Sequence, residues 1–140
     1  MTLRLSAALL VAAALGATAC GGIETPSQNK VETFPGTIPV RGQGPAHGFS
    51  ASRTGEIEVK ITTLTPSTSN TFVGVLWTGR NSNGTCENSL GQVFGQNNFA
   101  QVGLPAISTQ ILSGGYCLVL YDVGSFTTTE SYTVTVSHPE

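Results

Sequence analysis

Cysteine and histidine are the side chains of this sequence best suited to chemistry, and both are scarce. The 140-residue chain has three cysteines and two histidines. Cys86 and Cys117 are 31 positions apart, no Cys-x-x-Cys motif occurs, and neither histidine lies near either cysteine in sequence. Metal sites and reactive thiol pairs usually have such neighbours, so a structural disulfide is favoured over these alternatives. It would stabilise the fold by about 3–4 kcal/mol.

The two histidines are the imidazole bases that catalysis would need. His138 lies near the C-terminus, where we expect it to be mobile, and His47 lies in a predicted strand beside the core. A lone histidine without a nucleophile and an orienting acid seldom makes a catalytic site. Glu56 and Glu58 alternate with apolar residues, which predicts a solvated strand face and not the carboxylate pair of a glycosidase. The sequence also lacks G-x-S-x-G, HExxH and phosphate-loop motifs. It therefore predicts no catalytic residue, no metal site and no cofactor.

Charge is scarce throughout the chain. Charged residues make up 10% of it, against about 25% in an average globular protein. An apolar content of 39%, together with strand-like patterns, favours an all-β exported domain over low-complexity disorder. The net charge is −2 and no basic patch occurs, so nucleic-acid binding is not expected.

An export signal is predicted in residues 1–19. Arg4 precedes an apolar run from Leu5 to Ala17, which is shorter than the roughly 20 apolar residues of a transmembrane helix. Small residues then lead into Cys20, as in a secretory signal. Residues 17–20 resemble the bacterial lipobox, which implies that the Cys20 thiol carries diacylglycerol. Ordinary signal-peptidase cleavage before Cys20 is the alternative. Removal of residues 1–19 takes away Arg4 and leaves five basic and eight acidic side chains, a net charge of −3.

The lipobox resemblance also sets the organisation of the exported chain. Residues 20–30 are small and polar and predict a flexible tether behind the lipidated Cys20, and residues 31–140 are predicted to form one folded domain. The implied partner of the tether is a bacterial membrane. The outer membrane is favoured over the inner one because Gly21 stands where an aspartate retains lipoproteins on the inner membrane in some bacteria.

Ten strand-like segments, read as about eight short strands, and no convincing amphipathic helix are predicted after residue 30. Segments 56–62 and 131–137 alternate between apolar and polar residues, which indicates strands with one buried face. The predicted inward side chains are Ile57, Val59, Ile61, Tyr132, Val134 and Val136. Segments 72–77 and 116–121 are apolar on both faces, as expected of strands inside a sheet.

The remaining strands are bounded by Gly, Pro, Asn and Ser turns. They are predicted at 31–34, 37–40, 46–52, 92–94, 99–102 and 106–112. The last of these could instead form a single helical turn, and the strand is favoured. Two packed antiparallel sheets would cover the apolar faces, so the expected fold is a jelly-roll-like β-sandwich with one disulfide.

Five short motifs span residues 34–136 in a characteristic order. They are Phe34-x-Gly36, His47-Gly48-Phe49, Gly55-Glu56-Ile57-Glu58-Val59, the run from Gly114 to Asp122, and Tyr132-Thr133-Val134-Thr135-Val136. This order resembles the bacterial pre-peptidase C-terminal family of β-sandwiches. The resemblance implies a non-catalytic domain of an exported protein, in a family of which some members bind calcium, collagen or polysaccharide. Calcium is not expected here, because it takes about six to eight oxygen ligands and Asp122 is the only aspartate.

A binding surface is the functional feature that the sequence leaves open. Exposed aromatic side chains on a sandwich can stack on sugars or anchor peptides, although Trp77 and Tyr132 are expected to lie in the core. Tyr121 and Asp122 at a strand end, with Phe126 in the following loop, form the predicted binding rim.

We therefore expect a non-catalytic, membrane-tethered binding or accessory module of the bacterial envelope, with polysaccharide or protein as its partner. A structural lipoprotein that acts by self-association or as a spacer is the alternative. A hydrolase is the least favoured reading.

Overall fold

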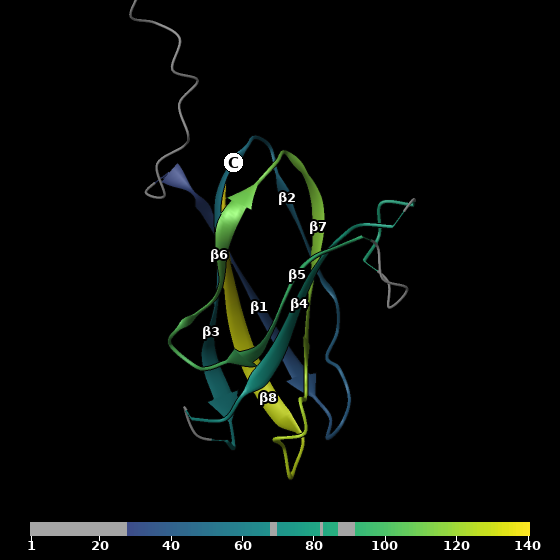
Figure 1. Cartoon of the computed structure of the whole chain (residues 1–140), viewed down its shortest axis with the longest axis vertical. Helices are drawn as coiled ribbons and strands as arrows, with labels where there is room; N and C mark the ends of the chain where they lie inside the picture. Colours follow the sequence, from purple (N-terminus) through teal and green to yellow (C-terminus); the bar gives the residue numbers. More distant parts are fainter. Residues whose placement is uncertain (1–27, 68–69, 82, 87–91) are drawn as a thin grey trace, which may run out of the picture.

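The computed structural model describes residues 28–67, 70–81, 83–86 and 92–140 (Figure 1). The predicted signal peptide, Cys20 and the tether as far as residue 27 lie outside the described residues. The strands are β1 (Lys30–Ile38), β2 (His47–Ala51), β3 (Gly55–Thr65), β4 (Val73–Gly79), β5 (Val93–Ala100), β6 (Pro105–Ile111), β7 (Gly114–Tyr121) and β8 (Glu130–His138). In this part of the chain we find no helix long and apolar enough to cross a membrane.

The eight strands form two four-stranded sheets that face each other (Figure 1). One sheet has the order β1-β8-β3-β6 and the other has the order β2-β7-β4-β5. Of the consecutive strands only β4 and β5 pair directly, and every other connection passes from one sheet to the other. This is the jelly-roll arrangement, so the predicted all-β sandwich of about eight strands is confirmed.

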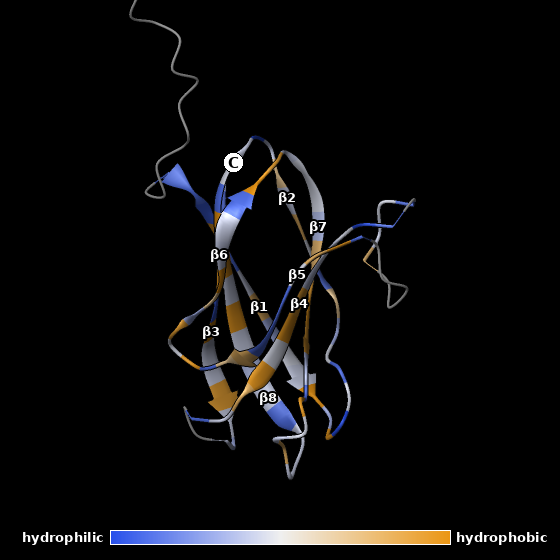
Figure 2. Cartoon of the chain, viewed as in Figure 1, coloured by the Kyte–Doolittle hydropathy of each residue, from blue (hydrophilic) through white to orange (hydrophobic). Residues whose placement is uncertain are grey.

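The core lies between the sheets and is built by alternation. All six side chains predicted to point inward from 56–62 and 131–137 are buried. In Figure 2, hydrophobic segments alternate with polar ones along these strands. The opposite sheet contributes Phe49, Leu118, Leu120 and Trp77, and Trp77 is 5% exposed, as predicted for a core residue. Alternation therefore specifies both the strands and the faces that they bury.

Four of the predicted strands are in fact two continuous ones. Segment 31–34 and the first half of segment 37–40 lie in β1, which pairs with β8 without a break through Pro35 and Gly36 and ends at Ile38. Proline is tolerated there because β1 is an edge strand. Glycine is required because a Cβ at Gly36 would lie 2.4 Å from the Tyr132 ring. Segments 92–94 and 99–102 similarly overlap the single strand β5, which ends at Ala100. Segment 106–112 overlaps the strand β6 and is not a helical turn.

The predicted disulfide between Cys86 and Cys117 is confirmed. Their Cα atoms are 5.5 Å apart. Cys117 is buried in β7, and Cys86 follows β4 after a short loop. The bond therefore fastens the loop that leaves β4 to the neighbouring strand of the same sheet.

Candidate functional site

The structure separates the three residues of the predicted binding rim. Phe126 is 5% exposed and belongs to the core, so it cannot contribute to an exposed surface. Asp122 is 9% exposed and its carboxylate is engaged by the fold. Tyr121 is partly exposed at the end of β7 and is the one rim residue that a ligand could contact through its side chain.

The Asp122 carboxylate organises two loops. Its Oδ1 accepts hydrogen bonds from the backbone N–H groups of Gly124 (2.7 Å), Ser125 (2.8 Å) and Phe126 (3.2 Å). Its Oδ2 accepts one from the N–H of Arg41 (2.7 Å), a residue held at positive φ. Burial raises the pKa of Asp122, but these four hydrogen bonds outweigh burial and hold the pKa below its ordinary value.

Replacing Asp122 with alanine should destabilise the domain. At pH 7 we expect a loss of about 3 kcal/mol, because four backbone donors lose a charged acceptor. Since folding lowers the pKa of Asp122, its contribution is present above the ordinary carboxyl pKa and is lost as the pH falls through the lowered one. Urea unfolding of wild type and Asp122→Ala should therefore differ at pH 7 and converge in acid. Equal midpoints at pH 7 would contradict the role assigned to the carboxylate.

The Tyr121 side chain lies across the neighbouring strand on the outer side of its sheet. Gly74 of β4 is directly opposite Tyr121, and a Cβ at Gly74 would lie 2.3 Å from two carbons of the Tyr121 ring. The absence of a side chain at Gly74 thus lets the ring rest on the backbone. The Tyr121 hydroxyl then reaches the edge strand β5, where it accepts a hydrogen bond from Gln96 Nε2 (2.6 Å) and donates one to Asn98 Oδ1.

A β-bulge in β5 exposes the residues beside this tyrosine. Val73 pairs with Ala100 and Val75 pairs with Asn97, so Asn98 and Phe99 together oppose the single residue Gly74. The Asn97 side chain holds the bulge, because its Oδ1 accepts from the Phe99 N–H (2.8 Å) and its Nδ2 donates to the Ala106 carbonyl (2.8 Å). Such a bulge redirects side chains, and both Asn98 and Phe99 are exposed, Phe99 to 73%.

These side chains surround a shallow hollow of about 500 Å³ on the outer face of the sheet. We call it the Tyr121 platform, and it is lined by Phe72, Gln96, Asn98, Phe99, Tyr121, Val123 and Ser125. The Phe72 and Phe99 rings meet edge to face with centroids 5.7 Å apart. No lining residue is charged. The platform thus offers apolar surfaces and amide groups to a neutral ligand.

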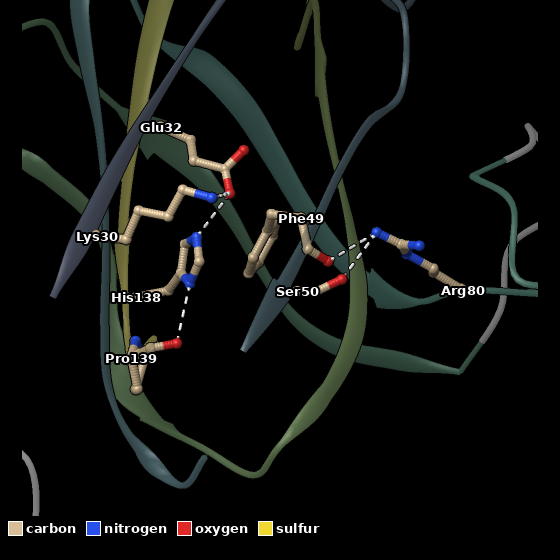
Figure 3. A network of polar contacts seen from close by, with 7 residues as sticks. All are labelled: Lys30, Glu32, Phe49, Ser50, Arg80, His138 and Pro139. Atoms are coloured by element: carbon tan, nitrogen blue, oxygen red, sulfur yellow. Dashed lines mark hydrogen bonds and ion pairs between the residues drawn. The ribbon is translucent and has the colours of Figure 1, made fainter. Parts of the chain in front are cut away.

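A second hollow of about 770 Å³ lies at the end of the sandwich where β6 turns into β7. Its aromatic lining consists of Trp77, Phe94 and Tyr116, whose ring centroids are 5.4–5.7 Å apart. Arg80 is the cationic lining residue, and its guanidinium is used by the fold (Figure 3). Its Nη2 donates to the Phe49 carbonyl and to Ser50 Oγ, each at 3.1 Å. This arrangement joins the loop after β4 to β2.

His138 is buried, so the predicted mobility of this residue is wrong. It is 1% exposed, and β8 extends through it. Its Nε2 lies 2.9 Å from Glu32 Oε1, which also pairs with Lys30 Nζ at 3.4 Å (Figure 3). Burial raises the pKa of Glu32, but these two partners lower it more, so the pKa is below its ordinary value. The network fastens the C-terminal strand to β1.

His47 lies among aromatic rings rather than in a catalytic cluster. It stacks on Phe34 with centroids 4.9 Å apart, and its Nε2 lies 2.7 Å from the Tyr132 hydroxyl. Burial lowers the pKa of His47 and raises the pKa of Tyr132 to about 12. Among the described residues, no group of three or more His, Cys, Asp or Glu side chains could hold a metal ion.

The fold and the platform together define a disulfide-bonded jelly-roll domain with an exposed aromatic and amide surface. No family model matches the sequence, and no curated protein matches it. A solved structure that does resemble it is that of the Yersinia pseudotuberculosis-derived mitogen, with 16% identity and a TM-score of 0.51. The match covers 80% of this chain and 88% of the mitogen chain. At this identity the likeness shows a shared fold.

Proposed function

We propose that the protein is a non-catalytic binding module, tethered to a bacterial membrane through a lipid on Cys20, which captures neutral polysaccharide of the cell envelope. The observation that carries the proposal is the Tyr121 platform, where an aromatic side chain is hydrogen-bonded to two exposed amides and no lining residue is charged. Aromatic side chains with a few oriented polar groups are typical of ligand sites.

A polysaccharide suits this surface better than a charged ligand or a deeply bound small molecule. Sugar rings combine apolar C–H faces with polar hydroxyl groups, and the platform offers both kinds of partner. The hollow is shallow and lies on a sheet face, so a chain can pass across it without ending there. Beneath it, Tyr121 rests on the central strand β4 and is hydrogen-bonded to β5.

Two alanine variants test the platform. Phe99→Ala should weaken binding to polysaccharide from the bacterial envelope by about tenfold, which corresponds to the loss of about 1.4 kcal/mol of aromatic contact. Tyr121→Ala should weaken it by about 100-fold, because it also removes the hydroxyl that contacts both amides. Co-sedimentation with residues 20–140 carrying Cys20→Ser would measure this. Leu112→Ala is the matched control, because Leu112 is 69% exposed but lines the second hollow. Unchanged binding in both platform variants, or a larger loss in Leu112→Ala, would overturn the assignment.

The lipid anchor has a separate test. Strand β1 begins at Lys30, ten positions after Cys20, so the predicted tether would let the domain project from a membrane. Intact mass of the protein from its native host should show a diacylglycerol group on Cys20. It should also show a gain of about two daltons on reduction of the one bridge. An unmodified Cys20 would refute the membrane tether and leave a secreted domain with a spare thiol.

A further inference from the structure

We infer that the Tyr121 platform recognises the acetamido group of an N-acetylated sugar. This inference rests on the proposed function and specifies the ligand of the same site. It follows from the hydrogen-bonding directions of the two amides and from the apolar residues around them.

The Tyr121 hydroxyl couples the orientations of the two amides. It accepts from Gln96 Nε2 and donates to Asn98 Oδ1, and Gln96 Nε2 also donates to Asn98 Oδ1 at 3.1 Å. An amide nitrogen only donates and an amide oxygen only accepts, so one amide cannot be reversed without the other. If both are reversed, the same three contacts form in the opposite direction, and one donor and one acceptor still face outward. The other ends therefore remain for a ligand, and no described residue forms a hydrogen bond with Gln96 Oε1 or Asn98 Nδ2.

An acetamido group matches this pair of free ends. Its N–H can donate to Gln96 Oε1, and its carbonyl can accept from Asn98 Nδ2. Its methyl group requires an apolar neighbour, which the exposed side chains of Phe72, Phe99 and Val123 provide. A sugar that carries only hydroxyl groups would use the amides but leave this apolar surface in water. The lack of charge on the platform likewise disfavours sugars with carboxylate or phosphate groups.

Two tetrasaccharides with the same β-1,4 linkage separate these possibilities by titration calorimetry. We expect the tetramer of N-acetylglucosamine to bind at least about tenfold more tightly than the tetramer of glucose. Asn98→Asp should remove that preference, because it keeps the oxygen that Tyr121 contacts and replaces the outward donor with an acceptor. Gln110→Glu is the matched control, since it makes the same chemical change at an exposed position of β6 in the other sheet.

The outcomes distinguish this inference from the proposed function. Equal affinity for the two tetramers would overturn the acetamido assignment and leave polysaccharide binding intact. A preference that survives in Asn98→Asp, with an unchanged urea midpoint, would also overturn it. Failure of both tetramers and of envelope polysaccharide to bind would overturn both proposals.

Discussion

Replacing Cys86 and Cys117 together with alanine is expected to lower the free energy of unfolding by about 3–4 kcal/mol. The bond joins residues 31 positions apart and encloses β5 and β6, so its loss frees a long loop in the unfolded chain. That is a large share of the roughly 5–15 kcal/mol that stabilises a typical domain.

Urea unfolding of the double variant measures this loss directly. Wild-type protein unfolded in the presence of a reductant is the control and should reach the same midpoint as the variant. If the variant unfolds at the wild-type midpoint, the disulfide contributes nothing to stability, which would contradict the stabilising role assigned to it.

Gly74→Ala should reduce polysaccharide binding by about 100-fold, or about 2.7 kcal/mol. Its Cβ would occupy the place of the Tyr121 ring, which must then leave the sheet. The aromatic surface and the orientation of both amides are lost together, so the effect should exceed that of Phe99→Ala. Gly95→Ala on β5 is the matched control, because its Cβ would meet the Trp77 ring at an ordinary 3.4 Å.

A double variant tests whether Gly74 acts through Tyr121. Gly74→Ala combined with Tyr121→Ala should bind no more weakly than Tyr121→Ala alone, since the two changes share one cause. Additive losses would mean that Gly74 supports the site in some other way.

The strands could be predicted wherever a local pattern decides them. Apolar side chains alternate with polar ones at Ile57, Val59 and Ile61. This alternation is enough to predict a strand with one buried face. The pattern failed at Pro35 and Gly36, which read as a turn and lie inside β1. An edge position removes the cost of the proline, and the ring of Tyr132 takes the space at the glycine. Both reasons come from strands distant in sequence.

Of the residues that line the candidate site, only Tyr121 was predicted from the sequence. Its partners Gln96 and Asn98 come from a strand 23–25 residues earlier, and the exposure of Phe99 depends on a bulge that no local signal announces. Gly74, inside an otherwise apolar strand, was the one available clue, because such a glycine often marks a close approach of another group.

The resemblance to the pre-peptidase C-terminal family, the export signal and the lipid on Cys20 stay predictions.

A titration of ¹⁵N-labelled protein with the N-acetylglucosamine tetramer, followed by NMR, tests directly whether the Tyr121 platform binds glycans. The proposed site predicts that the largest chemical-shift changes fall on the backbone of Gly74, Phe99 and Tyr121 and on the side-chain amides of Gln96 and Asn98. Changes confined to the hollow lined by Trp77 and Leu112, or none at saturating ligand, would contradict the claim that the Tyr121 platform binds glycans.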